Sequence, residues 1–299
     1  MIYFRDAKIE KSATATRNLL LAFLSQKQPK LARMMVWFWQ KQYNNITYKQ
    51  MREALEAGVC PPEFYDQWRQ EYSELVVTTL MPAWQDAIIE GRKQLVQQFS
   101  GRYQPSYEAM IDWTADHAAN WVVDVTEAQR KAINGLIQRA TILEGQTADS
   151  LAKIIRPTIG LYPQQATANL RYYENVREKH IESGLSAAKA EEKALHAAVK
   201  YGERQHRYRA QMIARTELAA AYNVSEQKGV EQAIKDGYMS VNTIKRWSTA
   251  DDDRVCNHCK EMEGKEVPIN ELFSNGFLTP PAHPNCRCAV EYIDKDDII

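Results

Sequence analysis

The chain has 299 residues, 44% hydrophobic and 25% charged, a balance typical of folded soluble proteins with one large or two ordinary domains. Lysines and arginines together number 38, as do aspartates and glutamates, so the overall charge gives no argument for nucleic-acid binding. No apolar run approaches the roughly 20 residues of a membrane span, and no signal peptide is visible. We therefore expect a cytosolic product with no membrane partner.

The two ends of the chain differ in charge. Residues 1–60 contain ten lysines and arginines against four acidic residues, whereas residues 250–299 contain eleven acidic residues against five basic ones. The basic residues of the first segment include Arg5, Lys8, Lys11 and Arg17. Two interpretations stay open: a basic arm that contacts a polyanion, and two solvated ends of one folded protein.

Apolar residues recur at helical spacing through much of the first 60 residues, and Trp37 and Trp39 crowd a single turn of this pattern. The two tryptophans indicate either a helix buried on most sides or an aromatic surface that docks on a partner. Residues 58–62 predict a break. The isolated Cys60 within that break is expected to be an inert thiol, either buried or half-buried.

Residues 63–99 carry apolar side chains every three or four positions. This pattern predicts one long amphipathic helix, or two helices joined near Pro82, where the missing N–H would produce a kink. A further helix is expected to place four side chains on one stripe: Met110, Trp113, His117 and Trp121. Because its neighbours are aromatic and apolar, His117 is expected to be a core histidine rather than a metal ligand.

Four shorter helices are predicted after residue 125, which together form a compact helical bundle. Thr126 and Gln129 have the spacing of a capping box, so the first is expected to begin at Thr126 and to stop near Gly145. The second is expected to be capped by Thr147 and to end at Pro157. The third is expected to start at Pro163 and to stop at Gly184. The fourth is an alanine-rich helix from Ser186 to about Tyr201.

The next predicted helix, residues 204–234, begins with a cation-rich stretch. The basic residues of this stretch, which also contains Tyr208, are Arg204, His206, Arg207, Arg209 and Arg215. A basic stripe next to an aromatic residue can follow a phosphate backbone, which makes Arg204, Arg207 and Arg209 candidate nucleic-acid contacts. The alternative is a solvated helix face. Gly237 is expected to end the helix, and residues 243–249 alternate as in a strand.

Four of the five cysteines gather near the end of the chain with one histidine, as Cys256, Cys259, His283, Cys286 and Cys288. Two thiols separated by two residues can bind one metal ion from a tight turn, and the later side chains supply the remaining ligands. In a reducing compartment such a cluster indicates metal thiolates rather than disulfides. The preferred set is Cys256, Cys259, His283 and Cys286. On an extended segment Cys286 and Cys288 point to the same side, so Cys288 is an alternative ligand.

Four protein ligands leave no coordination position open for water, so the predicted site holds one structural zinc ion per chain rather than a catalytic one. Free, buried thiols are the alternative. Short strands are expected at residues 266–269 and 288–293, and this segment has little core of its own. Structural zinc contributes on the order of 10 kcal/mol in small modules, so we expect the ion to stabilise residues 243–293.

Acidic residues near the cluster raise the possibility of metal-dependent chemistry. Asp251, Asp252, Asp253 and Glu217 are side chains of the kind that bind magnesium in a nuclease. However, a triple-aspartate loop is usually a solvated turn, and no histidine is placed beside it as a general base. His258, inside the Cys-x-x-Cys turn, is expected to be exposed. We therefore predict no catalytic residues and no enzymatic activity.

The motifs between residues 206 and 292 follow a recognisable order. They are Ile213-Ala214-Arg215-Thr216-Glu217, Asn223 on the same helix, a strand with Trp247, Asp252-Asp253-Arg254-Val255-Cys256 leading to Cys259, Gly264, and Pro281-Ala282-His283-Pro284-Asn285-Cys286-Arg287-Cys288. This order resembles the phage Mu F-like family of head morphogenesis proteins. Arg215, Glu217, Asn223 and Asp252 match motif positions of that family. Because Arg215 and Glu217 do not share a helix face, we expect separate contacts that tie the helix to the zinc module.

The resemblance implies a minor head protein of a tailed bacteriophage, assembled in the host cytoplasm and located inside the procapsid near the portal. It implies roles in head assembly and in DNA packaging or delivery, with the portal protein as a partner, and the major capsid or scaffolding protein and phage DNA as further candidates. Some relatives carry an added toxin or ADP-ribosyltransferase domain, and we expect none after the closing strand here.

The predicted fold class is α+β and mostly helical: a helical bundle followed by a small zinc-stabilised module containing β-strands. Residues 1–125 are expected to form a helical region that binds the portal or another partner. Residues 126–299 are expected to form the head morphogenesis domain, with the zinc-binding segment at 243–293. The alternative function is a DNA-binding or metal-dependent DNA-processing protein.

Overall fold

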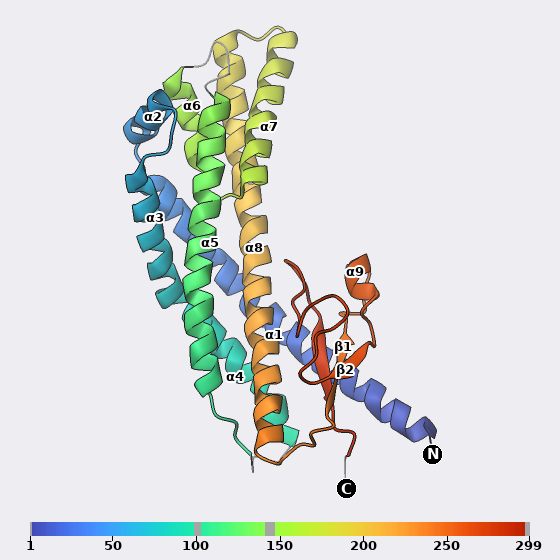
Figure 1. The fold of residues 1–299 in the computed structure, drawn as a ribbon. Helices are drawn as coiled ribbons and strands as arrows, with labels where there is room; N and C mark the ends of the chain where they lie inside the picture. The colour runs from blue at the N-terminus through green and yellow to red at the C-terminus, as the bar shows by residue number, and fades with distance from the viewer. Residues whose placement is uncertain (1, 99–102, 141–146, 297–299) are drawn as a thin grey trace. The chain divides into compact units, whose positions relative to one another are not determined.

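The structure, a computed structural model, describes residues 2–98, 103–140 and 147–296, and side chains from residue 15 onward apart from those of residues 94, 98 and 140. The chain is 71% helical, with a three-stranded antiparallel sheet near its C-terminus (Figure 1). The predicted class, α+β and mostly helical, is therefore confirmed. None of the described helices is long and apolar enough to cross a membrane.

The described elements are helices over most of the chain and three short strands towards its C-terminal end. The helices are α1 (Ile2–Asn45), α2 (Tyr48–Ala57), α3 (Pro62–Leu75), the π-helix η1 (Val76–Leu80), α4 (Met81–Gln98), α5 (Glu108–Ala140), α6 (Ala148–Ile155), the 3₁₀-helix η2 (Arg156–Thr158), α7 (Pro163–Glu182), α8 (Ala187–Lys235) and α9 (Asn257–Lys260). The strands are β1 (Ile244–Ser248), β2 (Glu266–Pro268) and β3 (Ala289–Ile293).

The chain divides into two compact units, each assembled from separate segments. Unit 1 comprises Met1–Leu31, Leu80–Asp116 and Gln211–Ile299, and unit 2 comprises Ala32–Thr79 and His117–Ala210. Both units therefore draw on both sides of the predicted boundary after residue 125, which falls within α5. The functional division into residues 1–125 and 126–299 stays a prediction.

Most of the predicted helix boundaries are present. The break at residues 58–62 separates α2 from α3, and the hydroxyl of Thr147 accepts a hydrogen bond from the Ser150 N–H at the start of α6. Gly184 and Gly237 follow α7 and α8 with φ angles of 87° and 78°, in the left-handed region that ends helices and favours glycine. Near Pro82 the chain forms two helices, α3 and α4, with the π-helix η1 between them.

The predicted capping box at Thr126 is wrong, because α5 continues through this position. The buried Thr126 hydroxyl donates to the Val122 carbonyl, 2.6 Å away and one turn back, as a helix-interior threonine does. Gln129 does not reach back to a cap but accepts a 2.6 Å hydrogen bond from the Tyr72 hydroxyl. Tertiary packing has therefore overridden a local signal. Gly145, the predicted stop, lies outside the described residues.

The two helices predicted at residues 186–201 and 204–234 are one helix, α8. Gly202, between them, is buried in the helix interior and does not interrupt it. A Cβ atom at this position would meet Asn169 and the Pro157 carbonyl at ordinary contact distances of 3.7 Å, so the neighbouring segments lie close to this turn.

Aromatic side chains build the core of unit 2. Trp39 is 1% exposed, and its indole donates to the Tyr72 hydroxyl at 3.1 Å. Trp37, by contrast, is 64% exposed, and its docking on a partner stays a prediction. Cys60 is buried, as predicted, and burial raises the pKa of its thiol to about 12. In the same unit α2 packs on α6 (Figure 1).

In unit 1, the three strands form a sheet in the order β2-β1-β3 with all pairs antiparallel. The predicted strands at residues 243–249, 266–269 and 288–293 are thus all present. Ser248 at the end of β1 pairs with Ala289 at the start of β3. This register brings the chain just before the Cys-x-x-Cys turn beside the chain just after Cys288.

Candidate metal centre

The five candidate ligands lie on two segments that the sheet brings together. Cys256 caps the short helix α9 and Cys259 lies within it, so the Cys-x-x-Cys turn is a single helical turn. Cys288 directly precedes β3. Cys259, Cys286 and Cys288 are buried in one core cluster of the module with Trp247 and Phe273, whose rings meet edge to face at 5.0 Å.

The ligand atoms form two overlapping groups that share Cys259. One group is Cys256, Cys259 and His283, and the other is Cys259, Cys286 and Cys288, with all ligand atoms in a group within 4.8 Å of one another. The His283 Nε2 atom lies 3.2 Å from the sulfur of Cys256 and 3.1 Å from that of Cys259. The sulfurs of Cys259 and Cys286 are 3.9 Å apart.

Within each group, the measured separations suit ligands of one tetrahedrally coordinated ion. Ligand atoms bonded at about 2.0–2.3 Å to one zinc ion lie about 3.3–3.8 Å apart, close to the distances found. A cavity of about 20 Å³, lined by all five residues, lies among them. The cluster could therefore hold a metal ion. Because Cys286 and Cys288 belong to the same group, both stay candidates for the remaining coordination position.

The thiols of the second group share protons unequally. Hydrogen bonds from Cys259 and Cys288 lower the pKa of Cys286 to about 2, and the bond to Cys286 raises the pKa of Cys259 to about 12. A bound cation would displace the protons of these thiols. His258 is exposed, as predicted.

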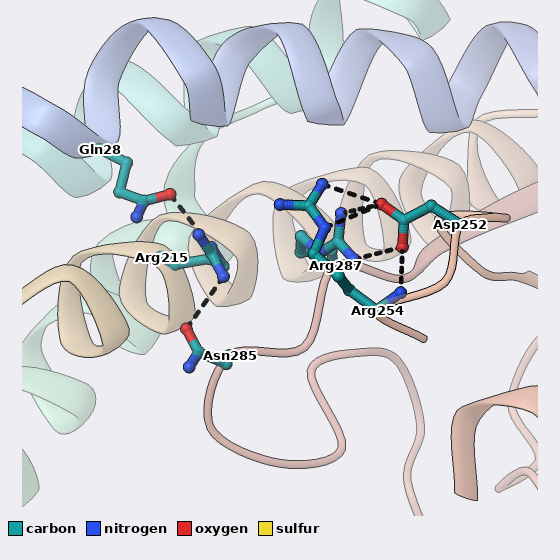
Figure 2. Close-up of polar contacts among 6 residues, drawn as sticks. All are labelled: Gln28, Arg215, Asp252, Arg254, Asn285 and Arg287. Atoms are coloured by element: carbon teal, nitrogen blue, oxygen red, sulfur yellow. Dashed lines mark hydrogen bonds and ion pairs between the residues drawn. The ribbon is translucent and has the colours of Figure 1, made fainter. Parts of the chain in front are cut away.

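Two residues of the Ala-Arg-Thr-Glu motif on α8, Arg215 and Thr216, contact the ligand segment, and Figure 2 shows the contacts of Arg215. The Arg215 guanidinium donates through Nη1 to the Asn285 side-chain oxygen and through Nε to Gln28 of α1, both at 3.1 Å. The Thr216 hydroxyl accepts from the Asn285 N–H at 3.0 Å. Glu217 instead accepts a 3.2 Å hydrogen bond from the Trp84 indole of α4. Arg215 thus reaches the module, whereas this bond of Glu217 joins α8 to α4.

Asn223, two turns further along α8, lies fully buried at the other end of the ligand segment. Its side-chain nitrogen donates to the carbonyls of Ala219 and Cys288, at 2.8 and 3.2 Å. The family-motif residue Asn223 therefore contacts the backbone of a candidate ligand.

Asp252, the last of the predicted motif residues, forms ion pairs with two arginines instead of contributing to a metal site. Both of its oxygens accept from Arg287, at 2.6 and 2.7 Å, and Arg254 donates to one of them at 2.9 Å (Figure 2). The bonds from Arg287 hold the pKa of this carboxyl well below its usual range. Asp251 lies 3.4 Å from Arg17. Among the described residues, neither potential metal-binding group contains a carboxylate, so the alternative magnesium site finds no support.

The predicted basic stripe on α8 is divided by burial. Arg204 and Arg207 are exposed, but Arg209 is fully buried, so its interpretation as a nucleic-acid contact is wrong. Its guanidinium packs over the rings of Trp39 and Tyr162 and donates to the Gly160 carbonyl. Of the predicted N-terminal arm, Arg5, Lys8 and Lys11 lie outside the residues whose side chains are described, and Arg17 pairs with Asp251.

Sequence reasoning missed Thr216, Asn285 and Arg287 as residues that hold the cluster. Asn285 has a φ of 69°, a conformation that asparagine tolerates better than most residues. An asparagine between two candidate ligands was therefore a weak sign that the backbone turns sharply there. The partners of Thr216 and Arg287 lie 69 and 35 residues away along the chain, beyond any local pattern.

The fold and the site define a helical protein whose C-terminal module is built around a Cys/His cluster on the face of α8. Residues 131–291, more than half of the chain, match the family described as Phage Mu protein F like protein. The chain therefore belongs to this family of phage head morphogenesis proteins, as its motifs predicted.

One curated relative is similar over a shorter stretch. The chain is 33% identical over 92 residues to NAD(+)--arginine ADP-ribosyltransferase EFV of Enterococcus faecalis, a match that covers 27% of this chain and 18% of that protein. The chain thus spans less than a fifth of that relative's length. No solved structure matches the chain.

Proposed function

We propose that this protein is a minor head protein of a tailed bacteriophage, assembled in the host cytoplasm. It acts inside the procapsid near the portal vertex, in head assembly and in DNA packaging or delivery. The observation that carries the proposal is the family match over residues 131–291, which includes both the motif face of α8 and the Cys/His cluster.

The partner-binding role falls to residues 1–125, outside the matched region. This part of the chain exposes large apolar side chains, among them Trp37 at 64%, Val77 at 63% and Ile111 at 67%. Exposed apolar side chains are what a protein partner can bury. The portal protein is the first candidate, and the major capsid or scaffolding protein the second.

The Cys/His cluster holds one structural zinc ion in this proposal. Zinc would join the Cys256–Cys259 turn to the segment that carries His283, Cys286 and Cys288, and four protein ligands would leave no open position for substrate. The protein therefore acts without enzymatic chemistry of its own. ADP-ribosyl transfer, the activity in the relative's name, is not carried over because the match covers 18% of that protein.

Co-expression with the portal protein of the same phage tests the proposal. We expect the full-length chain to co-purify with the portal and to appear at one vertex in a cryo-EM map of the procapsid. A variant with Trp37→Ala and Val77→Ser should lose the association and stay folded, because both side chains are exposed. Procapsids that assemble normally without any associated copies of the chain would contradict the proposal.

DNA binding is the second candidate, favoured by the exposure of Arg204, Arg207 and Tyr208 on one stretch of α8. Electrostatic binding should weaken steeply as salt rises, and Arg204→Ala with Arg207→Ala should reduce the slope by about one unit for each phosphate that is no longer neutralised. Affinity that does not respond to salt would count against this candidate, and absence of nicking with magnesium or manganese would remove a cleavage activity.

A further inference from the structure

The segment from His283 to Cys288 carries three of the five candidate ligands but belongs to no helix or strand. Its conformation therefore depends on contacts with the rest of the unit. Asn285, between His283 and Cys286, has a φ of 69°, which is uncommon for a residue other than glycine. Contacts from other residues must hold Asn285 in this conformation if His283 and Cys286 are to face the same ion.

The holding contacts come from α8 and engage both the backbone and the side chain of Asn285. Its N–H donates to the Thr216 hydroxyl at 3.0 Å, and that hydroxyl donates its own proton to the Met212 carbonyl at 2.8 Å. The Thr216 oxygen is thus fixed as an acceptor facing Asn285. Arg215 donates through Nη1 to the Asn285 side-chain oxygen and through Nε to Gln28 of α1, so the guanidinium itself is held on two sides (Figure 2).

The far end of the segment is held in a similar way. Asn223 donates to the Cys288 carbonyl, and Arg287 forms a bidentate ion pair with Asp252. Thr216 and Asn223 lie two turns apart, which places them on the same face of α8. One helix face therefore contacts the ligand segment at two points, Asn285 and Cys288.

We propose that Arg215 and Thr216 are positioning residues for the metal centre: through Asn285 they fix the backbone that aims His283 and Cys286 at a common ion. This inference rests on the zinc binding in the proposed function. Residues outside the ligand set that orient ligands typically change metal affinity 10- to 100-fold when removed. The Ala-Arg-Thr-Glu motif thereby acquires a chemical role that does not require it to touch the metal.

The test measures zinc release from the full-length protein to an excess of a chromophoric chelator. Thr216→Val keeps the side-chain shape but removes the acceptor for the Asn285 N–H, and it should release zinc roughly 10-fold or more faster than the wild type. Thr216→Ser restores the hydroxyl and should return the rate to near that of the wild type. Thr126→Val is the matched control, because the Thr126 hydroxyl makes the same bond one turn back, in α5.

A second readout separates positioning from general loss of stability. Cobalt in place of zinc gives absorption bands that report the geometry and the number of thiolate ligands. In Thr216→Val and Arg215→Lys these bands should shift or weaken, whereas in Thr126→Val they should match the wild type at a temperature where all variants are folded. Asn285→Gly, which keeps access to positive φ, should disturb the spectrum less than Asn285→Ala.

The outcomes distinguish the two proposals. A wild-type protein that holds about one zinc, with Thr216→Val releasing it at the wild-type rate and giving an unchanged cobalt spectrum, would overturn the positioning role and leave the metal assignment standing. A wild-type protein that binds neither zinc nor cobalt would overturn both the positioning role and the zinc part of the proposed function. Its phage-head role would then be judged by the portal experiment alone.

Discussion

Among single residues, Cys259 is the central member of the cluster. It is 3% exposed, lies within α9 and belongs to both groups of possible metal ligands, whereas Cys256 and His283 belong to one group and Cys286 and Cys288 to the other. Any four-ligand set that contains all three members of either group includes its thiolate. Loss of this one sulfur should therefore disable the site whichever of Cys286 and Cys288 completes it.

Cys259→Ser is expected to reduce the zinc content from about one ion per chain to near zero and to unfold residues 243–293, because structural zinc supplies much of the folding energy of such modules. Elemental analysis and hydrogen exchange of this segment measure the two effects. Cys60→Ala is the matched control: it removes a buried thiol outside the cluster, in unit 2, and should leave zinc content unchanged. Full zinc occupancy in Cys259→Ser would contradict the assignment.

A second residue-scale prediction concerns acid stability and His206. Burial lowers the pKa of this histidine to about 4, and its ring lies 5.6 Å from that of Trp39 while Nε2 hydrogen-bonds the Ile159 carbonyl at 2.8 Å. The unfolded chain takes up a proton near pH 6.5 and the folded chain only near pH 4. Stability is therefore unaffected above about pH 7.5 and falls as the pH drops from about 6.5 towards 4, by up to roughly 2–3 kcal/mol.

His206→Gln retains an N–H donor for the Ile159 carbonyl but does not titrate. At pH 7.5 we expect it to be no more stable than the wild type, and the difference between the two should shift in favour of the variant as the pH falls from about 6.5 to 4. Denaturant unfolding at a series of pH values gives this difference directly. A difference that stays constant over the whole range would show that His206 titrates alike in the folded and unfolded chains.

Among the elements, α8 has the widest set of roles, because different stretches of it serve different purposes. Arg204 and Arg207 are exposed, and Arg209 is buried between aromatic rings. Arg215, Thr216 and Asn223 contact the ligand segment. A helix can serve all three only if it is continuous, and Gly202 and Gly229 are its two positions of lowest helix propensity.

Gly202→Ala should stabilise the protein by about 0.5–1 kcal/mol, because an added Cβ meets neighbours no closer than 3.7 Å and alanine lowers the entropy of the unfolded chain. Gly91 of α4 supplies the contrast. Its Cβ would lie 2.5 Å from the backbone carbonyl oxygen of Tyr222 on α8, so Gly91→Ala should destabilise by roughly 1–3 kcal/mol. Chemical denaturation of the two variants checks the signs, and a destabilised Gly202→Ala would show that the helix bends or opens at this turn.

Over the whole molecule, two units are built from interleaved segments, and the candidate metal centre belongs to unit 1. Unit 2 contains its own aromatic core around Trp39, Trp68 and Tyr72. All five candidate ligands lie in unit 1, so removal of a bound metal should destabilise unit 1 more than unit 2.

Removal of metal with a strong chelator is expected to abolish amide protection in residues 243–293 and to leave α6 and α7 of unit 2 protected. Hydrogen exchange with mass spectrometry resolves the two regions in one experiment. Re-addition of zinc should restore protection of the segment. Equal loss of protection in both units would mean that the ion stabilises the whole chain rather than its own module.

The sequence carried much of the fold because the relevant signals are local. The period of the apolar residues predicted helices, the Thr147 cap and Gly237 marked boundaries, and the three short strands were all placed correctly. The errors arose where a distant partner outweighed a local preference. Gln129 bonds Tyr72 instead of capping a helix, and Arg209 is enclosed by Trp39 and Tyr162 instead of facing solvent.

The sequence by itself determined the ligand types, the spacing of the five candidate ligands and the motif order that indicated the family, since these depend only on residue identity and position along the chain. The tertiary structure alone decided what surrounds them. It placed Asn285 against Arg215 and Thr216, and Asp252 against Arg287, because such pairs form only when segments distant in sequence pack together. The cluster and the helix face that holds it are thus joined by packing that no local pattern encodes.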